Sequence, residues 1–221
     1  EISGGDVQLR FHEPNALVPS LEVWDAVKNG AVDAGYTTPG YHAGKIPAVS
    51  YFTAVPFGPG ASEYVGWMEY GGGNQLKDRI YGEYGLKPLN CLVHAPETSG
   101  WFRKKINNVE ELKGMKMRFF GLGAMVMSKL GVSTQLLAGG DIYPALEKGV
   151  IDATEFSMPT HDLSYGFYQL AKFNYFPGWH QQTSIGELLL NKKAWNGLTK
   201  TQKSIISSAC ETTAWWALVR S

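Results

Sequence analysis

The sequence predicts an α/β protein built from two similar lobes, and two observations support that prediction. Segments typical of strands and of helices alternate along the 221 residues with short connections, as in α/β chains with mostly parallel sheets. In addition, residues 23–39 (VWDAVKNGAVDAGYTTP) and 142–159 (IYPALEKGVIDATEFSMP) repeat one pattern: an apolar helix end, a glycine, two aliphatic residues, Asp and Ala. Two such units far apart in one chain indicate two lobes.

The first half of the chain contains short elements with recognisable ends. Residues 7–11 alternate apolar and polar side chains, which predicts a strand. A helix is expected at 21–28, because Ser20 can cap its start and Gly30 can end it. The remaining predictions for this half are a strand at 31–36, helices at 63–70 and 75–84, and a strand at 87–94.

The second half continues the same alternation. A strand at 115–120 carries Arg118, and Gly149 ends the helix at 142–148 of the repeated unit. Thr199 and Gln202 form a capping box before a final amphipathic helix. The other predictions are strands at 101–106, 133–137, from 150 onward and at 185–190, helices at 109–112, 121–130 and 161–171, and an extended aromatic segment at 174–179.

Composition argues against two classes of protein. Lysine plus arginine and aspartate plus glutamate both number 20, so the chain lacks the excess of cations that broad nucleic-acid binding needs. No apolar run approaches the length of about 20 residues that a membrane helix needs. Hydrophobic residues make up 44% of the chain, which is enough for a sizeable core.

The cysteines and the chain ends give further indications. Cys91 and Cys210 lie in different apolar contexts, so buried free thiols are the preferred interpretation, with a single disulfide left open. The segment EISGGDVQLRF resembles the end of a helix followed by a strand and has no signal-peptide pattern, and WWALVRS stops inside a helical pattern. We therefore expect both ends of the chain to be truncated.

Candidate ligand-binding residues lie where the predicted strands end, because ligands of parallel α/β sheets bind beyond the carboxyl ends of the strands. The positions selected by this rule are Tyr36 to Tyr41, Glu97, Arg118, Glu155–Phe156 and Trp179–Gln181.

Arg118 and Glu155 are the most informative of these residues. Arg118 lies in an apolar strand, where a guanidinium can clamp a ligand carboxylate with two hydrogen bonds or form an internal ion pair. Glu155 follows a short apolar strand, and burying a carboxylate is costly unless it is paired or bound to a metal. A ligand-binding role and a structural salt bridge both remain open for these two residues.

Glu97 and the histidines are less specific. Glu97 alone is typical of an ordinary loop glutamate, but two carboxylates at one pocket can hold a hard cation such as Na⁺ or Ca²⁺. The histidines lack zinc spacing, and His180 is more simply a core or rim residue than a pocket residue. Neither GxGxxG, GxxxxGK nor GxSxG occurs, so neither nucleotide binding nor nucleophilic catalysis is indicated.

Four segments together carry a resemblance that extends over essentially the whole chain: SGWFRKKINNVEELKGMKMRFFGLGA, GGDIYPALEKGVIDATEF, FNYFPGWH and LLLNKKAWNGL. They are similar to the substrate-binding proteins of tripartite ATP-independent periplasmic (TRAP) transporters, the DctP family. They most resemble the branch that binds 2-oxo or 2-hydroxy acids. The resemblance implies a two-lobed periplasmic binding protein fold of type II, with a ligand cleft between the lobes and a long connecting helix.

The resemblance also implies a division of the chain. Residues 1–92 would form lobe I without its first strand–helix unit, and residues 93–184 would form lobe II. Residues 185–221 would supply a crossover strand and a long helix that spans both lobes.

Roles for individual residues follow from the same resemblance. Arg118 matches the family's signature arginine, which holds the substrate carboxylate. The metal ligands of the branch match Glu97, Glu155 and the main-chain carbonyl of Phe156, with Gln181 as a weaker candidate. This implies a metal ion, Na⁺ or Ca²⁺, between protein and substrate. The residues implied to shape the cavity are Tyr36, Tyr41, Trp179 and His180.

Three positions depart from the branch, which usually has Gln at position 97, Trp at 156 and a second aromatic residue at 180. The additional carboxylate of Glu97 favours a divalent cation or leaves Glu97 protonated. Phe156 and His180 would reshape the pocket wall.

The implied function is non-enzymatic capture of a small monocarboxylate, such as pyruvate or lactate, for delivery to TRAP membrane subunits. The implied location is the periplasm, a homodimer of the full-length protein is an open option, and no nucleic-acid partner is expected. Two other functions stay open. A metal-dependent enzyme acting on 2-oxo acids would use the cation to polarise a carbonyl, although no general base besides the metal ligands is evident. The ligand-sensing domain of a regulator would need a fused DNA-binding or signalling segment.

Overall fold

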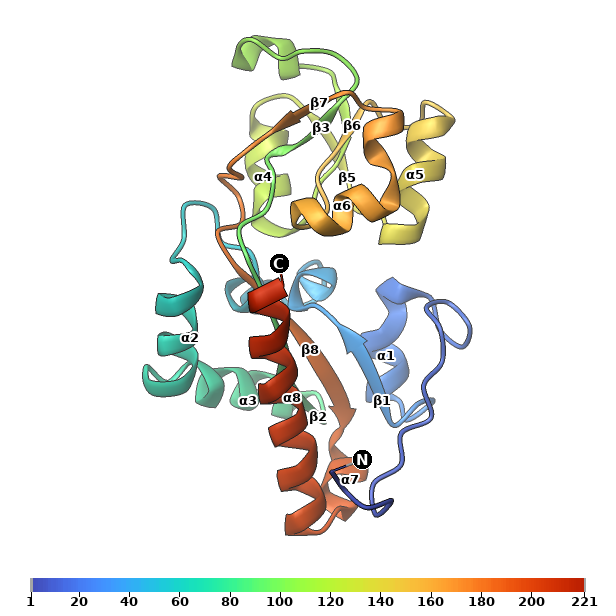
Figure 1. Cartoon of the computed structure of the whole chain (residues 1–221), viewed down its shortest axis with the longest axis vertical. Coiled ribbons are helices and arrows are strands. Elements are labelled where there is room, and N and C mark those ends of the chain that lie inside the picture. Colours follow the sequence, from blue (N-terminus) through green and yellow to red (C-terminus); the bar gives the residue numbers. More distant parts are fainter. Residues whose placement is uncertain (1, 221) are drawn as a thin grey trace.

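The chain forms two lobes, each built on its own β-sheet (Figure 1). The structure is a computed structural model that describes residues 2–220. The α/β class and the two lobes are confirmed, whereas the expected truncation concerns Glu1, Ser221 and what lies beyond them, outside the described residues. The sheet of lobe I has the order β1 (Ala34–Thr37), β8 (Ser184–Asn191), β2 (Leu86–His94). The sheet of lobe II has the order β5 (Ser133–Gln135), β4 (Lys116–Arg118), β6 (Ala153–Thr154), β3 (Gly100–Phe102), β7 (Phe173–Tyr175).

Helices cover both sheets and connect the strands. The α-helices are α1 (Val23–Lys28), α2 (Ala61–Tyr70), α3 (Gly73–Glu83), α4 (Gly121–Lys129), α5 (Gly139–Glu147), α6 (Pro159–Tyr165), α7 (Lys192–Gly197) and α8 (Lys200–Arg220). The 3-10 helices are η1 (Ser20–Glu22), η2 (Pro39–His42), η3 (Pro47–Phe52), η4 (Val109–Leu112) and η5 (Phe167–Gln169).

Lobe I has an antiparallel sheet. Strand β8 pairs antiparallel with both β1 and β2. The prediction of mostly parallel sheets is therefore wrong for this lobe, because β8 returns from lobe II and enters in the reverse direction between two strands that run the same way. The buried core beside this sheet includes Trp24, Phe52, Tyr81 and Leu189.

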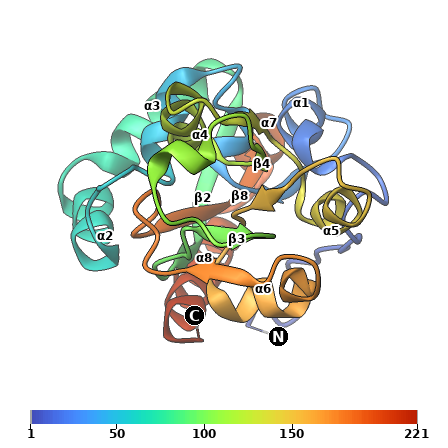
Figure 2. The same cartoon turned by 90° about the horizontal axis from the view of Figure 1, so that it is seen from above.

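Lobe II has a mixed sheet with a core on each face. Strand β4 pairs parallel with β5 and β6, and β3 runs antiparallel to β6 and β7. Adjacent residues of a strand point to opposite faces. Phe102 accordingly packs in one cluster with Met127 of α4, and Trp101 packs in another with Ile142 of α5. Figure 2 shows α4 on one side of β3 and α6 on the other.

The internal repeat is confirmed as a helix–glycine–strand unit in each lobe. Helix α1 leads through Gly30 to β1 of lobe I, and α5 leads through Gly149 to β6 of lobe II. Both glycines have positive φ values, 74° and 69°. This left-handed conformation ends a helix at little cost only when no Cβ is present.

The chain passes between the lobes through two segments, residues 95–99 after β2 and residues 176–183 before β8. These segments are hydrogen-bonded to each other: the Glu97 N–H donates to the Gln181 carbonyl (3.1 Å), and the Gly178 N–H donates to the Glu97 carbonyl (2.7 Å). The division into 1–92, 93–184 and 185–221 stays a prediction. In the structure β8 lies in the lobe I sheet, and α8 packs along β2 of the same lobe (Figure 1).

Local predictions hold where a side chain fixes the backbone. The Thr199–Gln202 capping box is present, with the Gln202 N–H donating to Thr199 Oγ1 (3.2 Å) and the Thr199 N–H donating to Gln202 Oε1 (3.0 Å). The strand predicted at 7–11 is wrong, since the segment is irregular and leaves Phe11 76% exposed. An alternating pattern of side chains is not sufficient for a strand, because a strand also needs a neighbouring strand to which its backbone can hydrogen-bond.

The preferred interpretation of Cys91 and Cys210 as free thiols is wrong, because they form a disulfide. Cys91 lies in β2 and Cys210 in the middle of α8. The packing of α8 against β2 brings the two residues together. The positions of the cysteines in the sequence do not predict this packing. The disulfide ties the long helix to lobe I.

We predict that the Cys91–Cys210 disulfide contributes about 2–5 kcal/mol to the free energy of unfolding, because it closes a long loop in the unfolded chain. Urea unfolding with and without reductant measures this contribution. The Cys91→Ala/Cys210→Ala double variant should unfold like the reduced protein and be insensitive to reductant. Equal stability of the oxidised and reduced protein would contradict the prediction.

Candidate functional site

Arg118 and Glu155 meet at the carboxyl ends of two parallel strands. Arg118 ends β4, and Glu155 directly follows β6, which pairs with β4 in parallel register. Nη1 of Arg118 donates to Glu155 Oε1 (2.7 Å) and to the Glu155 carbonyl (3.0 Å), and Nε donates to the Leu137 carbonyl (3.2 Å). Both side chains are at most 1% exposed. The sequence left an internal ion pair as an alternative for each of these residues. The structure contains that ion pair, and it joins Arg118 to Glu155.

Glu97, His180 and Gln181 come from the two segments that cross between the lobes. Gln181 donates an amide hydrogen bond from Nε2 to Glu97 Oε1. The Nε2 atom of His180 lies 3.5 Å from Glu97 Oε2 and 3.5 Å from Glu155 Oε2. The two crossing segments, residues 95–99 and 176–183 (the hinge segments), therefore place a carboxylate and an imidazole directly against the strand ends of lobe II.

The cluster of Glu97, Glu155 and His180 fits a bound cation. One ligand atom from each residue lies within 4.8 Å of the other two, and all three residues are buried. Glu97 Oε2, Glu155 Oε2 and both ring nitrogens of His180 have no hydrogen-bond partner among the described residues. Buried polar atoms without partners are costly, and a cation can satisfy them.

Burial and neighbouring charges shift the pKa values of the cluster in different directions. Burial raises the pKa of Glu97 to about 7, against the lowering effect of His180. Burial acts to raise the pKa of Glu155 too, but Arg118 and His180 outweigh it and the pKa is lowered. Burial acts to lower the pKa of His180, but the Glu155 and Glu97 carboxylates outweigh it and raise the pKa to about 9.

Aromatic rings surround the charged cluster. The guanidinium of Arg118 lies 5.2 Å from the centre of the Phe156 ring. The ring of His180 packs edge-on against Phe119 (4.9 Å between centroids) and against Trp179 (5.7 Å). Apolar walls of this kind lower the local dielectric and strengthen charge–charge interactions inside the site.

Lobe I closes over this group through η2. Burial raises the pKa of Tyr41, while the adjacent guanidinium of Arg118 acts in the opposite direction. The Tyr41 ring packs edge-on against Phe120 of lobe II, with centroids 5.8 Å apart. A Cβ added to Gly40 would lie 2.1 Å from the Phe120 ring, so glycine permits the two lobes to touch here. The cluster is therefore buried where the two lobes meet.

The residues predicted from the sequence divide into two groups. Those brought together are Arg118, Glu97, Glu155, Phe156, Tyr41, Trp179, His180 and Gln181. Tyr36 is different: it is 55% exposed, and its hydroxyl lies over Gly186 of β8 in lobe I. The carbonyl of Phe156 as a metal ligand stays a prediction.

Asp162 is a buried residue near the site that the sequence analysis missed. Its carboxylate accepts hydrogen bonds from the Ser157 N–H (3.0 Å) and from Trp101 Nε1 (2.7 Å). Burial raises its pKa to about 8, with Glu97 and Glu155 acting in the same direction. Asp162 holds the loop that follows Phe156. An Asp in the first turn of a helix is a signal for a helix start, but it does not indicate a contact with Trp101.

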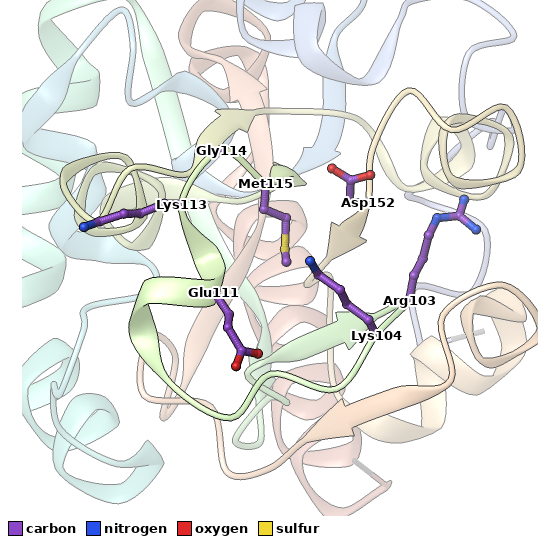
Figure 3. Close-up of a pocket in the computed structure, with 7 residues that line it drawn as sticks. All are labelled: Arg103, Lys104, Glu111, Lys113, Gly114, Met115 and Asp152. Atoms are coloured by element: carbon purple, nitrogen blue, oxygen red, sulfur yellow. The ribbon is translucent and has the colours of Figure 1, made fainter.

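A hollow with a volume of about 350 Å³ lies at the opposite end of the lobe II sheet (Figure 3). It is formed at the amino ends of β4 and β6 by Met115 and Asp152, together with Arg103, Lys104 and Lys113. The guanidinium of Arg103 donates hydrogen bonds to the backbone carbonyls of Leu146 and Leu170, so it stabilises the fold of lobe II. The candidate site is therefore the buried cluster at the carboxyl ends.

Comparison with known protein families decides the identity of the chain. The model of bacterial extracellular solute-binding proteins of family 7, DctP, matches residues 1–220. The chain belongs to this family. The family is periplasmic and consists of non-enzymatic transport components, which agrees with the expected absence of an enzyme activity. Among residues 2–220, no helix is both long and apolar enough to cross a membrane.

Three relatives are informative about ligands. A monocarboxylate 2-oxoacid-binding periplasmic protein of Nostoc sp. is 40% identical over 209 residues, covering 95% of this chain and 57% of the relative. A TRAP solute-binding protein of Bordetella bronchiseptica, a mixed-occupancy dimer with copurified calcium and picolinate, is 36% identical with a TM-score of 0.96, covering 99% of this chain and 65% of that one. A TRAP solute-binding protein of Pseudoalteromonas atlantica with bound sodium and pyruvate is 37% identical with a TM-score of 0.84, covering 88% and 59%.

We predict that His180 is protonated at pH 7 in chelator-treated protein and titrates near pH 9. Because its folded pKa lies above the ordinary value of about 6.5, its pairing stabilises the fold fully below pH 6.5 and loses this effect as the pH rises through 9. NMR of the imidazole carbons measures the titration, and the His180→Asn variant assigns the resonance. A midpoint near 6.5 would contradict the prediction.

Proposed function

We propose that this chain captures a small 2-oxo or 2-hydroxy monocarboxylate, such as pyruvate or lactate, between its lobes together with a cation. The observation that supports this most is a buried guanidinium paired with Glu155, beside a second buried carboxylate, Glu97, with the Oε2 atoms of both glutamates lacking a hydrogen-bond partner among the described residues. Arg118 would hold the ligand carboxylate, and Glu97 and Glu155 would hold the cation through their Oε2 atoms. Relatives that contain calcium or sodium beside a carboxylate ligand support the same arrangement.

Charge balance supports a divalent ion in this site. With both glutamates ionised and His180 neutral, Arg118, Glu97, Glu155 and a monocarboxylate sum to two negative charges. A divalent cation neutralises this sum, and an uncompensated charge in a buried site is costly. When bound, the cation would supply positive charge to the 2-position oxygen and to one carboxylate oxygen of the ligand.

Closure of the lobes would couple ligand binding to handover. Tyr41 from lobe I and Glu97 and His180 from the hinge meet Arg118 and Glu155 only when the lobes are together. A ligand that bridges these groups stabilises the closed state by the difference in its contacts with the two states. Delivery to TRAP membrane subunits by the closed form, and a homodimer of the full-length protein as in the Bordetella relative, are part of the proposal.

We predict that Arg118→Ala weakens pyruvate binding by about 100-fold or more, because the ligand carboxylate would be buried without a partner. Calorimetry in the presence of Ca²⁺ measures the affinity. Arg118→Lys keeps the positive charge but removes the planar guanidinium. It therefore tests the contact between this group and the ligand carboxylate even if the alanine variant unfolds. Arg79→Ala on the exposed side of α3 is the matched control. Unchanged affinity of folded Arg118→Lys for every carboxylate bound by the wild type would overturn the assignment.

We also predict that Gly40→Leu weakens pyruvate binding by about tenfold or more, because its side chain would collide with Phe120 and hold the lobes apart. Gly44→Leu is the control, since a Cβ at Gly44 meets no atom within 4 Å. Calorimetry of both variants decides the point, and equal affinities would argue against closure at this contact.

A further inference from the structure

We propose that His180 is a direct ligand of the bound cation, and that the site selects a first-row transition metal ion such as Zn²⁺ over Na⁺ and Ca²⁺. The inference rests on the cation site of the proposed function and adds a third protein ligand and a class of ion.

The position of the imidazole supports ligation. His180 has no exposed surface, and neither ring nitrogen has a hydrogen-bond partner among the described residues. Its Nε2 lies 3.5 Å from Glu97 Oε2 and 3.5 Å from Glu155 Oε2. Ligand atoms at about 2.1 Å from one ion, at tetrahedral angles, lie about 3.4 Å from one another. The two spacings from Nε2 thus suit an ion of this size.

Surrounding residues orient the ligand side chains. Gln181 holds Oε1 of Glu97, and Arg118 holds Oε1 of Glu155, so each carboxylate offers its Oε2 atom. The His180 ring is fixed by Phe119 at 4.9 Å between ring centroids. Outer partners of this kind orient metal ligands and raise metal affinity.

The donor set determines the class of ion. Ca²⁺ takes six to eight oxygen ligands, whereas an imidazole nitrogen suits zinc and other first-row transition ions. One imidazole and two carboxylates supply three ligands and leave room for oxygens of the bound carboxylate, as in zinc sites that keep a position open and can expand to five ligands. The imidazole replaces the aromatic residue that the 2-oxo-acid branch was expected to have at position 180.

Metal titration of chelator-treated protein tests the proposal. Calorimetry would use ZnCl₂ and CaCl₂ as separate probes, without any carboxylate, on the wild type and on His180→Gln. We expect His180→Gln to weaken Zn²⁺ binding by at least about tenfold and to change Ca²⁺ binding by less than about threefold. Since transition ions bind many oxygen sites more tightly than Ca²⁺, the decisive quantity is the change caused by His180→Gln. Visible absorption of bound Co²⁺ should change with the same variant.

Two further variants control for structure. His180→Phe keeps a ring against Phe119 and removes both nitrogens, and thermal unfolding shows whether each variant is folded. His161→Gln alters a histidine of α6 outside the cluster and should leave both affinities unchanged. Equal loss of Zn²⁺ and Ca²⁺ binding in folded His180→Gln and His180→Phe, or no loss of either, would overturn the proposal.

The outcome also separates this inference from the proposed function. If His180→Gln selectively weakens Zn²⁺ binding but no pyruvate binds with any metal, the ligand assignment holds and the proposed function fails. If pyruvate binds with Ca²⁺ equally well in both proteins and Zn²⁺ binding is unaffected, the proposed function holds and the inference about His180 is overturned.

Discussion

The buried ion pair between Arg118 and Glu155 is the interaction on which the candidate site depends. It joins the ends of β4 and β6, and both partners are almost completely buried. Two charges are taken out of water here, and removing one partner of such a pair typically costs about 3–5 kcal/mol. Because Arg118 occupies one oxygen of Glu155, the other oxygen is directed at the hinge, where Glu97 and His180 lie. The pair thereby sets the orientation of Glu155 within the cluster.

The fold divides the site between the two lobes and the segments that cross between them. Lobe II supplies the ion pair, and the two crossing segments supply Glu97 and His180, while Tyr41 and Gly40 come from lobe I. The Cys91–Cys210 disulfide fastens α8 to the sheet of lobe I. In the proposed function, a cation would be bound by residues of lobe II and of the hinge segments. Separation of the lobes would disturb these contacts, which links ligand capture to closure. A disulfide also suits the oxidising environment of the periplasm.

Much of the fold and of the site was predictable from the sequence, for physical reasons that differ between residues. The repeat around Gly30 and Gly149 predicted two lobes because a glycine stop leaves a local signature. Arg118 and Glu155 were predicted because charged residues beside buried strands are rare. Their mutual pairing, the Trp101–Asp162 hydrogen bond and the Cys91–Cys210 disulfide depend on long-range packing, which no local pattern encodes. The sheet of lobe I is antiparallel because β8 comes back from lobe II and inserts between β1 and β2. The short connections between the other elements do not predict this insertion.

A crystal structure of the chain with pyruvate and Co²⁺, with anomalous diffraction recorded at the cobalt absorption edge, tests the central claim most directly. Our proposal predicts one anomalous peak in bonding contact with Glu97 Oε2, Glu155 Oε2 and His180 Nε2, and the pyruvate carboxylate on Arg118. A peak away from these atoms, or pyruvate bound without contact to Arg118, would contradict it.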